Sequence, residues 1–165
     1  MSIVGTTIYR RAVFSECGKY RYRIFRTWDI SKNGVLFILL NPSTADENKD
    51  DPTVRRCMGF AYKWGYGWLE IRNLFALRST NPKMLYKSND PIGPDNSLFY
   101  DDDQFDKIVL AWGNHGKLKG RGDAVMKMMV DRGQPAYYFS LTKTYQPIHP
   151  LYVGYDVELT RLGLM

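Results

Sequence analysis

Residues 35–42 read VLFILLNP, and this stretch decides the fold. Its first six residues are all apolar, with no alternation between apolar and polar positions. An uninterrupted apolar run indicates a strand that is covered on both faces, as the strands of parallel sheets are. The run stops at Asn41, and Pro42 removes a backbone N–H and keeps its predecessor extended. We therefore expect a buried strand that ends in a rigidly held carboxamide.

The pattern of an apolar run that stops at a polar side chain recurs three more times. WLEIR precedes Asn73, IVLAWG precedes Asn114, and YYFSL precedes Thr142. If the runs are parallel strands of one sheet, their polar ends lie along the same edge, where open α/β sheets bind ligands. The sequence thus predicts one shared site, built from strand ends.

Helical patterns separate these runs, and a hairpin precedes them. Residues 8–29 alternate around a turn, which predicts an antiparallel hairpin with one aromatic and one basic face. Asp51 and Pro52 have the chemistry of an N-cap and a first helical residue, and short helices are also expected over residues 93–100 and the last dozen residues. The alternation predicts an α/β fold, a three-layer sandwich with a mostly parallel four-stranded central sheet plus the hairpin, in a single domain over 1–165.

Composition narrows the class of protein and of partner. The 165-residue chain is 44% apolar and 15% aromatic, which is enough for the core of one domain. Its formal charge of +6 favours an anionic partner such as a nucleotide or DNA, although many basic proteins bind no nucleic acid. Two cysteines without metal or redox spacing, no signal-peptide pattern and no long apolar run predict a cytoplasmic protein of a bacterial cell, without a membrane partner.

Asn41 and His149 are the candidate catalytic residues. A rigid amide at Asn41 can orient a water or a base. His149 lies in a loop that prolines stiffen, where a neutral imidazole can donate to a developing oxyanion or to a phosphate. Each has a plainer interpretation, a capping asparagine in the first case and a solvated or structural histidine in the second.

Asn73 is the candidate reader of a base, because a carboxamide offers a donor and an acceptor side by side and matches an edge of uracil, thymine or adenine. A turn former at a strand end is the alternative. Basic side chains would contact phosphates, and a solvated basic face explains them equally well. The candidate phosphate ligands are Arg55, Arg56, Arg78 and Lys117. Asn114 and Thr142, at two of the strand ends, complete the expected ligand contacts.

The acidic loop from Asp46 to Asp51 has the chemistry to bind a divalent cation or activate a water. Helix capping by Asp51, and ion pairs of Asp50 with Arg55 or Arg56, are the more economical explanation, so no metal site is predicted. The stretch GNHGKLKGRG has the glycine content of a phosphate cradle, but it matches neither the P-loop nor the dinucleotide spacing. We expect no cofactor, and the oligomeric state is left open.

Several motifs resemble those of a bacterial and phage family described as a domain of unknown function. They are NPSTAD at 41–46, DDPTVRRC at 50–57, NLFALRSTNP at 73–82, AWGNHG at 111–116 and HPLY at 149–152. The likeness covers roughly residues 8–153, nearly the whole chain. It implies membership of that family and brings no activity with it.

At a greater distance, the order of elements resembles the uracil-DNA glycosylase superfamily. The Asn-Pro motif at Asn41, the strand-end Asn73, the Trp-Gly strand end at Trp112 and the His-Pro loop at His149 are similar to its mismatch-specific branch. The resemblance implies a glycosylase-like fold in which Asn41 positions the attacking water, Asn73 reads the base and His149 stabilises the departing base. Ser43 and its neighbour replace an expected glycine, and HPLY lacks the small residues of the glycosylase loop, so the fold carries over more safely than the activity.

Two functions share this expected pocket. One is an N-glycosidic hydrolase that acts on a base in DNA or in a nucleotide, after drawing the base out of its stack. The alternative is a non-catalytic, phage-type sponge that sequesters a nucleotide-derived immune signal, with the basic residues named above clamping its phosphates. A DNA-binding accessory factor ranks third. Both leading hypotheses require Asn41, Asn73 and His149 to converge on one cleft.

Overall fold

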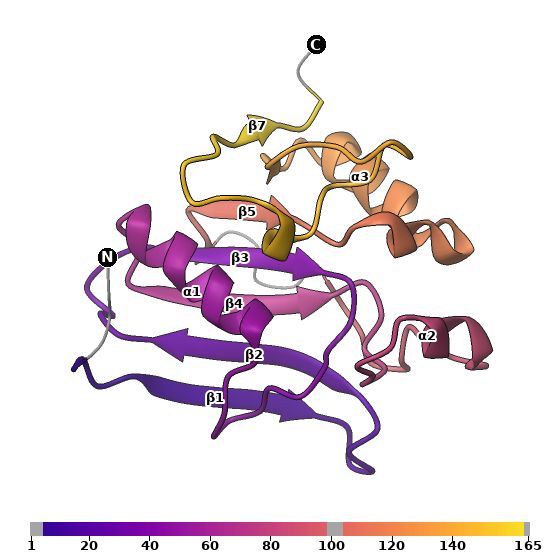
Figure 1. Cartoon of the computed structure of the whole chain (residues 1–165), viewed down its shortest axis with the longest axis horizontal. Helices are drawn as coiled ribbons and strands as arrows, with labels where there is room; N and C mark the ends of the chain where they lie inside the picture. Colours follow the sequence, from indigo (N-terminus) through magenta and orange to yellow (C-terminus); the bar gives the residue numbers. More distant parts are fainter. Residues whose placement is uncertain (1–4, 99–103, 164–165) are drawn as a thin grey trace.

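Strand β3 (Gly34–Leu39) runs through the middle of the sheet, and all of its residues are buried. The computed structural model describes residues 5–98 and 104–163. In it, β3 pairs in parallel with β4 (Trp68–Asn73) on one side and with β5 (Lys107–Leu110) on the other (Figure 1). The uninterrupted apolar run therefore forms the buried, parallel strand that its pattern predicts.

Antiparallel strands extend this parallel centre on both sides. The hairpin of β1 (Tyr9–Phe14) and β2 (Arg21–Thr27) joins through β2, which pairs with β4. On the other side, the very short β6 (Tyr137–Tyr138) pairs in parallel with β5, and β7 (Thr160–Arg161) pairs antiparallel with β6. The sheet thus has seven strands in the order β1-β2-β4-β3-β5-β6-β7, so the predicted four central strands plus the hairpin omitted one strand, β7. The C-terminal helix was also wrong, because a strand forms there.

Helices cover both faces of the sheet. Helix α1 (Pro52–Lys63) begins as predicted, with Asp51 as its N-cap. Helix α3 (Arg121–Asp131) packs on the opposite face, and α2 (Lys83–Lys87) lies beyond the ends of β3 and β4 (Figure 1). Residues 93–98 are not helical, and the rest of that predicted helix lies outside the described residues. No helix within the described ranges has the length and apolarity needed to cross a membrane.

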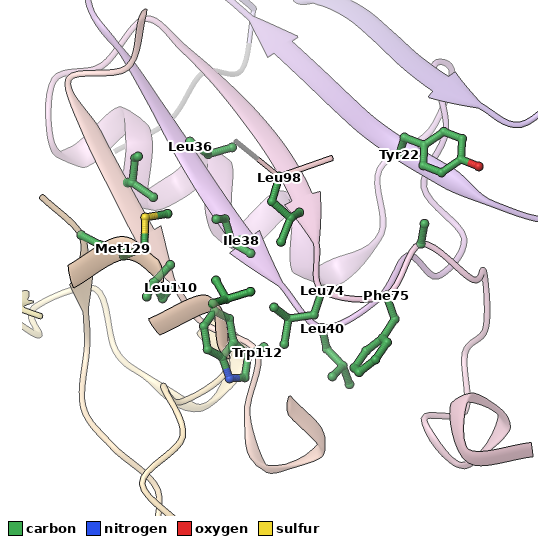
Figure 2. Close-up of a cluster of buried hydrophobic side chains, with 14 of the residues drawn as sticks. Tyr22, Leu36, Ile38, Leu40, Leu74, Phe75, Leu98, Leu110, Trp112 and Met129 are labelled. Carbon is green, nitrogen blue, oxygen red and sulfur yellow. The ribbon is translucent and has the colours of Figure 1, made fainter. Parts of the chain in front are cut away.

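The core consists of two apolar layers, one on each face of the sheet. Leu36 and Ile38 point into the layer that contains Met129 of α3 (Figure 2). Val35 and Phe37, which alternate with them along β3, point into the layer under α1. Full burial of side chains of this size stabilises the fold by about 1.5–3 kcal/mol each. Both faces of the sheet are therefore occupied, and any ligand site must lie at its edge.

The order of the strands places a crevice at the end of β3. The chain leaves β3 through α1 to reach β4 on one side, and it later returns to β5 on the other side. Connections that diverge in this way open a crevice at the carboxyl ends of the strands, which is where α/β sheets bind ligands. Asn41, Asn73 and Trp112 each follow or end one of these three strands.

Candidate functional site

A small polar cavity lies at the carboxyl ends of β3 and β4, and we call it the inner cavity. Asn41, Asn73 and His149 all line it, together with Arg21 and Asp51. Its volume is about 30 Å³, enough for one or two water molecules or for the polar edge of a larger ligand. The structure thus brings together the two amides and the imidazole on which the sequence argument rests.

A larger, open groove adjoins the inner cavity, and we call it the outer groove. The two share Asn41, Ser43, Thr53 and His149 as lining residues, and the groove has a volume of about 450 Å³. This volume lies within the range of small-molecule sites. Of the described residues that line the groove, none is a lysine, arginine, aspartate or glutamate. The groove is therefore suited to an uncharged, ring-sized group.

The amide of Asn73 has no hydrogen-bond partner within the described part of the chain. The residue is 1% exposed, and both Oδ1 and Nδ2 are buried and unpaired. A buried polar group left without a partner costs about 1–3 kcal/mol. Since the same amide lines the inner cavity, its donor and acceptor are both available to a ligand there.

The nitrogen of the Asn41 amide already donates hydrogen bonds to the backbone. Its Nδ2 donates to the carbonyl oxygen of Ser79 at 2.9 Å and to that of Leu77 at 3.3 Å. Asn41 therefore holds the segment after β4 in place, which is close to the plainer, capping interpretation of this residue. Its Oδ1 remains the group that can accept a hydrogen bond from a water or a ligand.

His149 is held as a neutral imidazole of defined tautomer. Burial lowers the pKa of His149 to about 4, and the nearby Asp51 carboxylate opposes this only in part. The backbone N–H of Leu151 donates to Nδ1 at 3.3 Å, so the proton of the neutral ring is on Nε2. His149 is thus a hydrogen-bond donor at neutral pH, without a formal charge.

Arg21 is a site residue that the sequence analysis missed. The alternation in β2 placed it on the basic face of the hairpin, opposite the aromatic face, but it is 2% exposed and lines the inner cavity. The register of β1 and β2 shifts so that Phe14 pairs with Arg21 while Val13 pairs with Arg23. An extra residue in a strand reverses the faces of the residues beyond it, which turns Arg21 toward the layer under α1. Burial lowers the pKa of Arg21 to about 10, so the guanidinium is still charged at neutral pH.

The acidic loop is folded around protein partners. Asp51 accepts from the backbone N–H of Val54 at 2.9 Å as the cap of α1, while its carboxylate lines the inner cavity. Asp50 is bound by Arg26 at 2.7 Å and by Arg10 at 3.1 Å, and these partners replace the predicted Arg55 or Arg56. Among residues 5–98 and 104–163, no three His, Cys, Asp or Glu side chains cluster as a metal site would require.

Two further expected residues line the outer groove. Trp112 is 1% exposed, and its Nε1–H donates to Oε1 of Gln146 at 2.8 Å. Gln146 in turn donates to Asp123 of α3 at 2.8 Å, which fixes the indole against that helix. Asn114 also lines the groove, and its Oδ1 accepts from the hydroxyl of Thr144 at 2.7 Å.

The remaining expected ligand residues lie outside both spaces. Arg55 donates to the carbonyl of Asp50, and Arg56 lies over the ring of Tyr155. The hydroxyl of Thr142 accepts backbone N–H groups of its own turn, because β6 ends at Tyr138 and no strand reaches this residue. The others, Arg78 and Lys117, do not line the inner cavity or the outer groove. The sequence suggested a single pocket in which basic residues bind the phosphates. In the structure, these basic residues lie outside the inner cavity and the outer groove.

The sequence matches a family described as "Protein of unknown function (DUF1643)" over residues 21–151. The match covers most of the chain, so the protein belongs to this family. It includes Arg21, Asn41, Asn73 and His149, the polar residues around the inner cavity. No curated protein and no solved structure matches the chain.

Proposed function

We propose that this DUF1643 protein recognises a nucleobase or nucleotide, with the polar edge of the base in the inner cavity and the ring in the outer groove. The observation that carries this proposal is the amide of Asn73, which is buried and unpaired in a residue that lines the cavity. On folding, this amide loses its hydrogen bonds to water, which costs free energy. A ligand with a matching donor and acceptor would restore the hydrogen bonds.

The chemistry around the inner cavity matches the edge of a base better than it matches a charged group. Asn73 supplies a donor and an acceptor, and the neutral His149 supplies an N–H donor for a carbonyl oxygen or ring nitrogen. The two formal charges in the lining, those of Arg21 and Asp51, are opposite in sign. A neutral ligand with both donors and acceptors, such as uracil, thymine or adenine, satisfies this set.

The order of the elements supports the same proposal by analogy. An Asn-Pro motif after one strand, an asparagine at the end of the next, a Trp-Gly strand end and a late His-Pro loop resemble the uracil-DNA glycosylase superfamily. In this chain, Asn41, Asn73, Trp112 and His149 occupy those places and all line the inner cavity or the outer groove. The analogy concerns the arrangement and adds no activity of its own.

Calorimetric titration with uridine, thymidine, adenosine and their 5′-nucleotides tests the proposal. We expect at least one of them to bind, and Asn73→Ala to weaken it roughly 5- to 150-fold, because a buried hydrogen-bonded amide contributes about 1–3 kcal/mol. Asn33→Ala is the matched control, since Asn33 is an exposed asparagine just before β3, at the opposite end of the sheet. A panel in which nothing binds, or equal losses in both variants, would refute base recognition at Asn73.

A hydrolytic function is the second candidate, and the lining of the inner cavity favours it. The cavity can hold a water beside Asp51, Asn41 and His149. Asp51 would accept a proton from this water as its oxygen bonds to the sugar C1′. In the same displacement the bond from C1′ to the base would break, with its electron pair leaving on the base, where the N–H of His149 stabilises the charge.

Chromatographic detection of free base tests this second function, with Asp51→Asn as the diagnostic variant. Asparagine is also a good N-cap, so the substitution should leave α1 intact while removing the proton acceptor. Hydrolysis predicts that the variant binds its nucleotide but releases no base. If the wild-type protein binds nucleotides and releases no base from any of them, capture without turnover is the function that stands.

A further inference from the structure

A nucleotide bound as proposed has no cation for its phosphate within the outer groove. The lining of that groove carries no formal charge among the described residues, and the charge of Arg21 lies in the inner cavity opposite Asp51. Phosphates bind where positive side chains or backbone N–H groups surround them. An anionic part of the ligand must therefore extend beyond the outer groove.

A second groove, of about 470 Å³, lies directly beside the outer groove. Its lining includes Lys19, Arg78 and Lys87, and we call it the cationic groove. One carboxylate, that of Asp90, also lines it and accepts a hydrogen bond from the N–H of Gly93 at 3.0 Å. Three cations against one carboxylate leave the cationic groove with a net positive charge.

Ser79 lines both grooves, and the preceding Leu77 and Arg78 line only the cationic groove, so the segment 77–79 forms their shared border. The N–H of Ser79 donates to the carbonyl of Pro42, next to the proposed base site, at 2.9 Å. The N–H of Arg78 donates in the other direction, to the carbonyl of Lys19 at 3.1 Å. The backbone of segment 77–79 is therefore hydrogen-bonded on both sides, and an extended ligand can pass over it from one groove to the other.

We propose that the cationic groove binds a phosphate of a phosphodiester-linked nucleotide whose base occupies the inner cavity. This inference rests on the proposed function and adds the class of ligand, because a nucleoside would leave the cationic groove empty. A short oligonucleotide and a cyclic dinucleotide share the required chemistry, a base joined through ribose to a phosphodiester.

The cations of this groove are available to a phosphate. Lys19, Arg78 and Lys87 are all exposed. Arg78 lies over the ring of Phe14 and uses Nη1 to bond the carbonyl of Gly18 at 3.1 Å, which orients the guanidinium and leaves its other N–H groups for a ligand. The groove therefore combines one oriented guanidinium with two ammonium groups on flexible stems.

The experiment compares ligands of increasing length in two variants of equal net charge. Calorimetry and fluorescence anisotropy would use deoxyuridine, dUMP, the deoxyuridine trinucleotide and the cyclic dinucleotide of uridine, together with the same series carrying adenine. The test variant is Lys19→Ala with Lys87→Ala. The control is Lys32→Ala with Lys127→Ala, which removes the same charge from exposed lysines outside the groove that pair with Asp29 and Asp131.

We expect at least one phosphodiester ligand to bind tenfold or more tightly than its nucleoside, and the test variant to lose that gain while the control keeps it. The slope of log affinity against log salt should fall by about 0.7 in the test variant, because the loss of one phosphate contact removes about 0.7 on a single strand. The trinucleotide and the cyclic dinucleotide distinguish the two sources of this chemistry.

If nucleosides bind as tightly as every phosphodiester ligand, this inference is wrong. If Asn73→Ala still weakens the binding of those nucleosides, base recognition nevertheless stands. Equal behaviour of the two double variants would overturn the inference as well. An absence of binding by every ligand in the series would refute base recognition and this inference together. Thermal unfolding of both double variants checks that any loss of affinity is not a loss of fold.

Discussion

Asn73 is the residue at which the fold and the proposed function make opposite demands. It ends β4 inside the protein, where an apolar side chain would be cheaper, and its amide bonds to nothing among the described residues. Burying a polar atom without a hydrogen-bond partner lowers stability. A buried, unpaired side chain therefore indicates selection for a property other than stability, such as ligand binding. The unpaired amide is therefore an argument for a ligand that can be tested without knowing the ligand.

Asn73→Leu should stabilise the protein. Leucine has the same number and branching of side-chain heavy atoms, it removes both unpaired polar atoms, and it extends the apolar surface of the neighbouring Ile71 and Leu39. We expect the free energy of unfolding to rise by about 1 kcal/mol, measured by urea denaturation, while nucleotide binding is lost. Few substitutions of a buried polar residue act in this direction.

Gln146→Leu is the control for that prediction, because Gln146 is an equally buried amide with both ends bonded. Its oxygen accepts from Trp112 and its nitrogen donates to Asp123. Leucine there leaves these partners unpaired, so a loss of about 1–3 kcal/mol is expected. Two variants that destabilise the protein equally would show that the Asn73 amide is satisfied in a way that the structure does not reveal.

At the scale of elements, strand β2 shows how far a residue pattern can predict a site. Alternation correctly indicates a hairpin strand, but it assigns Arg21 to the basic face together with Arg23. The register shift in the hairpin instead buries this side chain at the inner cavity. Bulges of this kind depend on how two strands pair rather than on the composition of one, so period-2 alternation cannot reveal them.

The conformation of the loop between β3 and α1 is held by one buried guanidinium, that of Arg26. Arg26 is completely buried and binds Asp50, and it also donates to the carbonyl oxygens of Asp46 and Lys49. This loop carries the inner-cavity residue Ser43 and leads to Asp51. Arg26 is thus a positioning residue that shapes the site without lining it.

Arg26→Met should cost about 3–5 kcal/mol of unfolding free energy, since it leaves a mostly buried carboxylate without its main partner. Arg10→Met provides the comparison, because Arg10 binds the other oxygen of Asp50 and has a side chain that is 31% exposed. A loss below about 1 kcal/mol is expected there. Chemical denaturation of both variants measures the difference, and similar losses would contradict the assignment of the loop to Arg26.

At the scale of the whole molecule, the sequence predicts the long strands of the sheet well and the two-residue strands poorly. Continuous apolar runs identify β3 and β5, because residues buried on both faces leave a continuous signal, while the alternation of Leu69 and Ile71 identifies β4. The run YYFSL correctly locates β6, but only Tyr137 and Tyr138 of it form a strand, whereas β7 has two residues, too few to show any period, and was not predicted. The same limit explains the site: Asn41, Asn73 and Trp112 follow the long strands and meet, whereas Thr142 follows the short one and does not.

Because of His149, the free energy of unfolding of the whole molecule should decrease as the pH is lowered. Burial lowers its pKa in the folded protein to about 4, from the ordinary value of 6.5. The unfolded chain therefore binds the additional proton first, so the contribution of His149 is complete above pH 6.5 and is lost as pH falls toward 4. The loss should approach roughly 3 kcal/mol, measured as unfolding free energy in denaturant at successive pH values.

His149→Asn isolates this contribution from that of the carboxylates. His149 caps the short helix η3 (Pro150–Tyr152) by accepting from Leu151, and asparagine can make the same contact without titrating. The variant should start from a lower stability at pH 8, where the imidazole no longer packs, and then hold its value down to pH 5. Parallel pH curves for the two proteins would mean that His149 is accessible to solvent and titrates normally, and its role as a neutral donor at the inner cavity would then fail.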